Sequence, residues 1–348
     1  MYSLTPSLDT GDAISTLDTL LAADIRPDHF HGAIHHLQRR FASYADTSPA
    51  PFIAPGLVVT PEIRRQSEMY LPIAEITKIF NRLYCATLNS PPILSSSPFH
   101  NALSWADTFV GLPPQLQFSI NPSTLLEQLL NDRNLLTKFL FASFLPHRFY
   151  GGFRRYIGQT DFIRKWLLER KKATLRCLDA ACGTGEDSYG LATLLLERGF
   201  DREKIHIESW TIDPLEVWAA AHCSFPHDRQ REARFREETA ALFEHGYETR
   251  ICFRCVDLTK PPAEPFDLIL CNGLLGGPLF HEAQFVKNIV ANLAGILAPG
   301  GIMLAADSFH AGWKLHYPQQ MLRVVLEENG LRTFSAGEGV GGVKPGTV

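Results

Sequence analysis

The chain has 348 residues, enough for two domains that each bury a core. Its net charge of −4 comes from mixed charges, so the chain has no general attraction for nucleic acid or an anionic membrane surface. The start of the chain lacks a signal-peptide pattern, no apolar run is long enough to cross a membrane, and seven scattered cysteines indicate reduced thiols, so we expect a cytoplasmic protein.

The part of the chain before residue 150 contains 14 of the 23 prolines but only 4 of the 25 glycines. This composition favours helices separated by proline-rich loops over units in which a glycine turn joins a strand to a helix. We predict four helices, at Asp12–Leu21, Phe30–Tyr44, Pro61–Leu88 and Ser123–Leu145. Residues 1–148 are therefore expected to form a helical N-terminal domain.

Four histidines lie in or just before the second of these helices: His29, His31, His35 and His36. His31 and His35 are four residues apart, which is a common spacing for a pair of metal ligands on a helix. No H-E-x-x-H motif and no clear cysteine or carboxylate third ligand accompanies them. We expect a solvated or partner-facing helix here, and no metal site.

A basic segment follows. Between His147 and Arg176 nine arginines and lysines stand against two acidic residues. The segment is interpreted as a solvated helix over Thr160–Lys172 that leads into a strand. A positive rim for an acidic substrate is the alternative interpretation.

The next feature is a short apolar run of strand length, Leu175–Ala180. Gly183 and Gly185 end this run, and a helical pattern follows as far as Gly199. A glycine turn between a strand and a helix lets a ligand come close to the backbone, at the helix N-terminus. The pattern is typical of the first unit of a nucleotide-binding α/β domain.

The charges around this turn indicate which ligand it holds. No lysine of a Walker-type phosphate loop follows the glycines, and carboxylates flank the turn at Asp179, Glu186 and Asp187. These carboxylates would repel a pyrophosphate but favour a ligand that carries an ammonium and a sulfonium group. S-adenosylmethionine is such a ligand.

Strands and helices continue to alternate up to the last residues. Further strands are predicted at Ile205–Ile212, Thr249–Val256, Phe266–Cys271, Ile302–Ala306, Leu331–Glu338 and near Gly342–Val348. Asp213, Asp257 and Asn272 directly follow three of these strands. Ligands of parallel sheets bind outside the carboxyl ends of the strands, so these three residues are candidates for the site. For Asp213, ribose binding and a helix N-cap are both open, and the two roles are compatible.

The residues of the glycine turn carry a family resemblance. Asp179-Ala-Ala-Cys-Gly-Thr-Gly185 resembles motif I of the class I S-adenosylmethionine-dependent methyltransferases. The longer run Ala180–Ala192 is similar to the A-A-C-S-T-G-E-E-P-Y-S-I-A sequence of the chemotaxis-type (CheR-like) protein glutamate methyltransferases. The resemblance implies an α/β fold over residues 149–348, with a Rossmann-like seven-stranded sheet, helices on both faces and an antiparallel last strand. It also implies S-adenosyl-L-methionine as the cofactor, and a role for residues 1–148 in acceptor recognition or partner binding.

The resemblance further implies the site residues. Phe153-Arg154 is similar to the F-F-R element that precedes motif I, and Asn272 stands where the family's C-R-N motif has arginine. Arg154 and Asn272 are therefore the candidate catalytic residues. Glu186 is expected to bind the ammonium of the donor, and Asp257 the amino group of the adenine. The expected cofactor-binding residues are Asp179, Ala180, Gly183, Thr184, Gly185, Glu186, Asp213, Pro214, Asp257, Leu258 and Asn272.

The leading hypothesis is a methyltransferase that acts on an oxygen, of a carboxylate or a hydroxyl, in a protein side chain or a small molecule. The N-P-P-[YF] motif of amino-methylating enzymes is absent after Phe266–Cys271, which argues against a nitrogen acceptor. Two alternatives stay open: a non-catalytic S-adenosylmethionine-binding regulatory protein, and an RNA methyltransferase suggested by the basic segment. The leading hypothesis involves no membrane and no nucleic acid.

Overall fold

The computed structural model describes residues 2–47, 54–56, 58–145, 152–170, 174–276, 282–307 and 317–346. The chain forms two compact units. We call them the sheet unit, made of Met1–Ala13, Arg148–Ser224 and Glu232–Val348, and the helical unit, made of Ile14–His147 and Phe225–Arg231. The roles expected for the two domains, with their boundary at residue 148, stay a prediction.

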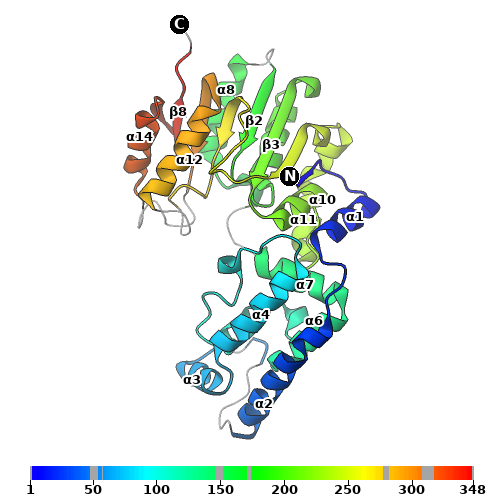
Figure 1. The fold of residues 1–348 in the computed structure, drawn as a ribbon. Coiled ribbons are helices and arrows are strands. Elements are labelled where there is room, and N and C mark those ends of the chain that lie inside the picture. Colours follow the sequence, from blue (N-terminus) through cyan, green and yellow to red (C-terminus); the bar gives the residue numbers. More distant parts are fainter. Residues whose placement is uncertain are drawn as a thin grey trace. The chain divides into compact units, whose positions relative to one another are not determined.

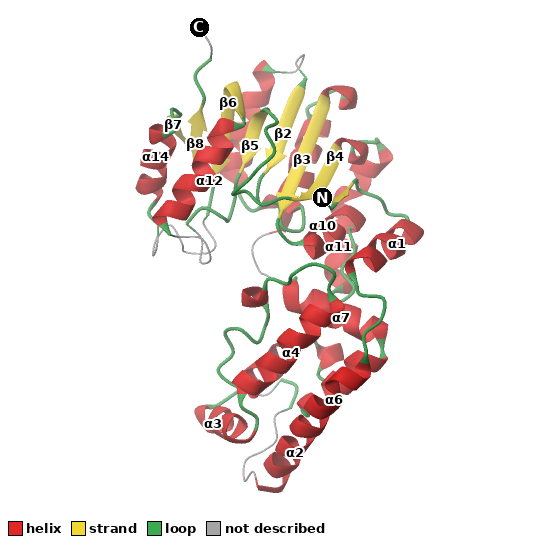
Figure 2. Cartoon of the chain, viewed as in Figure 1, coloured by secondary structure: helices red, strands yellow, loops and turns green. Residues whose placement is uncertain are grey.

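The sheet unit contains one mixed sheet with the strand order β1-β4-β3-β2-β5-β6-β8-β7 (Figure 2). The strands are β1 (Ser3–Leu4), β2 (Leu175–Asp179), β3 (Ile205–Thr211), β4 (Ile251–Cys255), β5 (Phe266–Leu270), β6 (Leu297–Ala305), β7 (Arg332–Ala336) and β8 (Gly339–Val343). Strands β4, β3, β2, β5 and β6 are parallel, and β8 lies antiparallel to both β6 and β7. The seven predicted strands and the antiparallel last strand are thus confirmed. Two of them are shifted: β6 begins at Leu297 instead of Ile302, and the last strand, predicted near Gly342–Val348, spans Gly339–Val343, with residues 347 and 348 outside the described residues.

An eighth strand was not predicted. The two residues of β1 pair antiparallel with the edge of β4, where Ser3 lies opposite Arg254. A two-residue strand has no periodic pattern that a sequence analysis can detect, because only its pairing defines it.

Helices cover both faces of this sheet, as predicted (Figure 1). They are α8 (Ile157–Trp166), α9 (Glu186–Glu197), α10 (Pro214–His222), α11 (Arg229–Glu244), α12 (Ala283–Gly295) and α14 (Gln319–Glu328). On one face, residues of α12 and α14 pack in a buried cluster with Trp210 and Phe266. On the other face, the ring of Tyr189 in α9 lies 5.5 Å from that of Phe253. The alternation of side chains along the strands sends Trp210 and Phe253 to opposite faces.

The described part of the helical unit contains α2 (His31–Thr47), α3 (Pro61–Tyr70), α4 (Ile73–Thr87), α5 (Trp105–Gly111), α6 (Pro122–Asn131) and α7 (Arg133–Phe144), and α1 (Thr10–Leu20) begins in the sheet unit and ends in this one. Two helices that were predicted to be continuous are each divided into two in the structure. Pro61–Leu88 is broken before Pro72, because the preceding residue, Leu71, leaves the helical conformation with φ −124° and ψ 67°. Ser123–Leu145 is broken at Asp132, whose carboxylate caps α7 by accepting hydrogen bonds from two of its backbone N–H groups.

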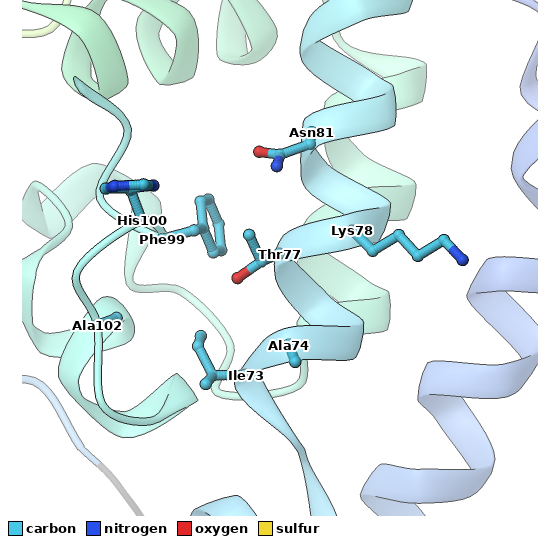
Figure 3. A pocket seen from close by; sticks show the side chains of 8 residues that line it. All are labelled: Ile73, Ala74, Thr77, Lys78, Asn81, Phe99, His100 and Ala102. Carbon is cyan, nitrogen blue, oxygen red and sulfur yellow. The ribbon is translucent and has the colours of Figure 1, made fainter. Parts of the chain in front are cut away.

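An aromatic cluster forms the core of the helical unit. The rings of Phe80 and Phe99 are stacked with their centroids 4.7 Å apart, and Trp105 and Phe139 lie against them. Beside this cluster the unit has an open cavity of about 530 Å³ (Figure 3). It is lined by Ile73, Ala74, Thr77, Lys78, Asn81, Phe99, His100 and Ala102.

Candidate active site

The ends of four parallel strands bring the predicted residues to one edge of the sheet. Asp179 ends β2, Asp213 and Asp257 follow β3 and β4, and Asn272 follows β5. Backbone hydrogen bonds continue past the strand ends, for example from Ala180 N to Leu270 O at 2.7 Å and from Val256 N to Thr211 O at 2.8 Å. The carboxyl edge of β4, β3, β2 and β5 is therefore a rigid frame for the site.

The glycine turn has the backbone conformation that its sequence requires. Gly183 and Gly185 have φ of 53° and 90°, and Gly185 immediately precedes α9. A Cβ atom on Gly185 would stand 2.8 Å from the ring of Phe253, so neither the conformation nor the space admits a side chain. Gly183 meets no such neighbour, since the nearest atom, Oε1 of Glu216, would lie 3.9 Å from its Cβ.

Asp179 is a buried carboxyl that is only partly satisfied. Its side chain is 1% exposed, and its Oδ2 accepts a hydrogen bond of 2.7 Å from the hydroxyl of Ser188. Its Oδ1 is buried and has no hydrogen-bond partner in the described part of the chain. Burial and the charge of Asp187 raise the pKa of Asp179 to about 7, against the opposing effects of Ser188, Arg155 and the nearby backbone N–H of Ala181.

The structure places Arg155 at the site, a residue that the sequence analysis did not select. Its guanidinium forms an ion pair of 2.7 Å with Asp187, and both side chains are largely buried. Burial alone would lower the pKa of Arg155, but the charge and hydrogen bond of Asp187 raise it. Its Nε is buried and has no acceptor among the described residues.

The predicted arginine, Arg154, lies one residue earlier. Its backbone belongs to a short 3₁₀ helix, Gly152–Arg154, which packs along α9, but its side chain lies outside the described residues. A Cβ on Gly190 would stand 3.3 Å from the carbonyl oxygen of Phe153. The signal for Arg155 was present in the sequence, because Arg155 follows Phe153-Arg154 directly and matches the F-F-R element equally well.

Asn272 is placed in a hydrogen-bond network. Its Nδ2 donates to Asp187 Oδ2 at 3.0 Å and to Gln159 Oε1 at 2.9 Å, and its Oδ1 accepts from Gln159 Nε2 at 3.1 Å. Gln159 was not selected from the sequence, and no local pattern marks it. The catalytic role considered for Asn272 stays a prediction.

The remaining predicted residues lie along the same edge of the sheet and differ in their hydrogen bonds and their burial. Glu186, in the first turn of α9, accepts a hydrogen bond of 2.7 Å from the hydroxyl of Thr184. Asp213 caps α10 by accepting from Leu215 N at 2.8 Å, and Pro214 is the first residue of that helix. The N-cap role weighed for Asp213 is therefore present, and its role toward ribose stays a prediction.

The pKa of Asp213 is raised to about 7 by burial and by the neighbouring charge of Glu216. Asp257 differs, since it is exposed and accepts hydrogen bonds of 2.8 Å from both the N–H and the hydroxyl of Thr259, which lower its pKa. The side chain of Leu258 packs on the core cluster under α12.

Three arginines of the basic segment make contacts within the sheet unit. Arg176 forms an ion pair with Glu264 at 2.5 Å, and the guanidinium of Arg170 lies 4.2 Å from the ring centre of Trp166. Arg155 is paired with Asp187 as described above. Four other basic side chains of the segment, at positions 148, 154, 171 and 172, lie outside the described residues, so the positive rim stays a prediction.

The comparisons with known proteins agree with this geometry. Residues 153–310 match the family model described as "CheR methyltransferase, SAM binding domain". A chemotaxis protein methyltransferase of Listeria innocua serovar 6a is 28% identical over 151 residues, which are 41% of this chain and 56% of that protein. The corresponding protein of Listeria monocytogenes serovar 1/2a is 28% identical over 192 residues, 52% of this chain and 72% of that protein. The chain thus spans about half the length of the L. innocua relative.

The chain also shows similarity to solved structures at low sequence identity. The N-methyltransferase NodS from Bradyrhizobium japonicum WM9 is 18% identical, with 56% of this chain and 97% of that chain covered and a TM-score of 0.36. In the described part of the chain, no helix combines the length and the apolar character needed to cross a bilayer.

The strand order and the glycine turn define a class I S-adenosylmethionine-dependent methyltransferase domain. More specifically, the family match over residues 153–310 and the two Listeria relatives support a CheR-like S-adenosylmethionine-dependent methyltransferase. The family and the cofactor predicted from the loop around Gly183 are confirmed.

Proposed function

We propose that this protein transfers the methyl group of S-adenosylmethionine to a carboxylate oxygen of a protein side chain. One observation supports the binding of the cofactor's amino-acid end at this position. Asp179 has a buried oxygen that lacks a donor, and nearby Arg155 has a buried N–H that lacks an acceptor, among the described residues. A buried polar atom without a partner costs about 1–3 kcal/mol, so this pair of atoms favours a ligand that satisfies both.

The amino-acid end of S-adenosylmethionine has the required groups. Its ammonium would donate to Asp179 Oδ1 and to the carboxylate of Glu186, the partner predicted from the sequence, and its carboxylate would accept from Arg155 Nε. A phosphate offers acceptors only, and it would meet the carboxylates of Asp179, Glu186 and Asp187. The other proposed cofactor residues follow along the sheet edge, with Asp213 for the ribose and Asp257 with Leu258 for the adenine.

When bound, S-adenosylmethionine supplies a methyl group activated by its sulfonium. In the reaction the acceptor oxygen forms a bond to the methyl carbon, the carbon–sulfur bond breaks, and its electron pair stays on sulfur to give S-adenosylhomocysteine. A carboxylate acceptor is already ionised at neutral pH and needs no general base. The protein then has to hold acceptor and methyl in line and exclude water, a role that a rigid sheet edge suits.

The acceptor follows from the relatives. The resemblance to the CheR-like family implies a glutamate, and the two Listeria relatives are named as chemotaxis protein methyltransferases. The helical domain would recognise this acceptor or bind a partner, in the cytoplasm. The basic segment does not favour RNA as acceptor, because Arg176 and Arg155 are paired within the domain.

The experiment has a binding part and a transfer part. Calorimetric titration with S-adenosylhomocysteine should show one site per chain in the wild type, weakened in Arg155→Met. Incubation of cell-extract proteins with S-adenosylmethionine labelled in the methyl group should then label a protein, and mild alkali should release the label as volatile methanol, since a methyl ester is hydrolysed by base. Label stable to alkali would refute the carboxylate acceptor. Binding without any labelling would favour the non-catalytic regulatory alternative, for which the replacement of arginine by Asn272 is the motivating observation.

A further inference from the structure

We propose that Gln159 is a positioning residue that fixes Asn272 and Asp187, and through them Arg155, for binding of the donor's amino-acid end. The inference rests on the proposed function. It adds a chain-specific device to it, because Asn272 stands where the CheR-like family has an arginine.

The pair of Gln159 and Asn272 is buried and reciprocal. The two residues are 3% and 4% exposed, and each side-chain amide donates to the other, at 3.1 Å and 2.9 Å. Turning one amide alone by 180° would place N–H against N–H and oxygen against oxygen. Turning both together would set the oxygen of Asn272 against the carboxylate of Asp187. With Asp187 as the third partner, the pair therefore has one satisfied orientation.

This orientation decides which way the second hydrogen of Asn272 points. With one Nδ2 hydrogen donated to Gln159, the other is donated to Asp187 Oδ2 at 3.0 Å. The same Oδ2 accepts from Arg155 at 2.7 Å. The two bonds to this one oxygen hold the Asp187 carboxylate between Asn272 and Arg155, and so fix the guanidinium of Arg155. Both hydrogens of Asn272 are used within the protein, which makes it a positioning residue as well.

Gln159 is itself held at the start of α8 by the turn between β7 and β8. The carboxylate of Glu338 accepts hydrogen bonds from Gly158 N at 3.0 Å and Gln159 N at 3.1 Å. Although partial burial would raise it, these N–H groups hold the pKa of Glu338 below its ordinary value. The turn sits so close that a Cβ on Gly158 would stand 2.9 Å from Gly337 Cα. Backbone contact and a charged cap thus fix the residue that orients Asn272.

The experiment compares amide-pair variants by titration with S-adenosylhomocysteine and by steady-state kinetics with S-adenosylmethionine. Gln159→Leu should weaken binding about ten- to hundredfold, the loss expected when a buried polar partner of a charged group is removed. The KM for the donor should rise while kcat changes little, because the donor's amino-acid end is held equally in the ground and transition states. The double variant Gln159→Asn/Asn272→Gln keeps both amides and the summed side-chain length, and should recover most of the affinity lost in either single change.

Val290→Ala is the matched control for stability. Val290 is fully buried in α12, away from the polar network, so this change lowers the melting temperature without touching the amide pair. Unchanged donor binding in Gln159→Leu, or an equal loss in Val290→Ala at the same melting temperature, would overturn the positioning role alone. A wild type that does not bind S-adenosylhomocysteine would instead overturn the proposed function, and the inference with it.

Discussion

Replacing Asp179 with asparagine should make the protein more stable at pH 8 while it weakens donor binding. The carboxyl is buried at the end of β2, and one of its oxygens has no partner among the described residues. Asparagine keeps an oxygen that can accept from the hydroxyl of Ser188, but it carries no charge. The variant therefore removes the cost of a buried charge that Ser188 and Arg155 offset only in part.

The size of this effect follows from the pKa. Ionisation of Asp179 in the folded chain occurs at about pH 7 instead of 3.8. At about 1.4 kcal/mol for each pKa unit, the ionised carboxyl costs the folded state about 4 kcal/mol. Because the folded-state pKa is the raised one, the cost is absent below about pH 4, grows as the pH rises to 7 and is constant above. Asp179→Asn should thus gain about 4 kcal/mol at pH 8 and less than about 2 kcal/mol at pH 5.

Urea unfolding of the wild type and the variant at both pH values measures this gain. Asp257→Asn is the matched control at the end of β4, because Asp257 is exposed and its pKa is lowered by the N–H and hydroxyl of Thr259. This control should not be stabilised at pH 8. In a parallel titration, Asp179→Asn should bind S-adenosylhomocysteine at least about tenfold more weakly than the wild type, since a neutral amide replaces a partner of the ammonium. A gain that is the same at pH 5 and pH 8, or no gain at all, would refute the assignment of a raised pKa to Asp179.

Three further predictions concern the same edge of the sheet. The affinity for S-adenosylhomocysteine should rise with pH by up to about tenfold per pH unit and level off above about pH 7, because the ligand needs Asp179 ionised. An affinity that calorimetry finds constant from pH 5.5 to 8 would contradict this. Gly185→Ala should lower the melting temperature more than Gly199→Ala. Both glycines have positive φ, but only a Cβ on Gly185 meets the ring of Phe253. Equal losses of melting temperature in the two variants would count against that contact. Arg155→Lys should keep a positive charge beside Asp187 yet bind S-adenosylhomocysteine at least about tenfold more weakly, because lysine lacks the Nε donor, and full retention of affinity in a titration would exclude that role for Nε.

The sheet could be predicted from the sequence because its signals are local. Each of the buried parallel strands that carry the site is a short apolar run followed closely by a polar side chain, and the residues after these strands had to meet at one edge once the sheet was parallel. Asp179, Asp213 and Asn272 were found in this way. The broken helices failed for the opposite reason. Continuous apolar periodicity outweighed the local stop signals at Pro72 and the capping carboxylate of Asp132, although both were present in the sequence.

The contacts that tune the site could not be predicted, because they join distant parts of the chain. Gln159 and Asn272 are 113 residues apart, and nothing near either one marks it as half of a reciprocal amide pair. For Arg155 the sequence indicates the segment but not the residue. The F-F-R resemblance points to the right segment, but only the position of the backbone along α9 shows that the guanidinium of Arg155 reaches Asp187.

The carboxyl groups along the sheet edge also explain why one end of the ligand has to be cationic. At the ends of β2 and β3, burial and a neighbouring carboxylate raise the pKa values of Asp179 and Asp213 to about 7. At the end of β4, the exposed Asp257 is already satisfied by its own turn, and its pKa is lowered. The demand for positive charge or for hydrogen-bond donors is therefore greatest at β2 and weakest at β4. A molecule with an ammonium and a sulfonium at one end, ribose hydroxyls in the middle and a neutral base at the other end matches this order, whereas a dinucleotide would bring its negative pyrophosphate to the carboxylates of the glycine turn.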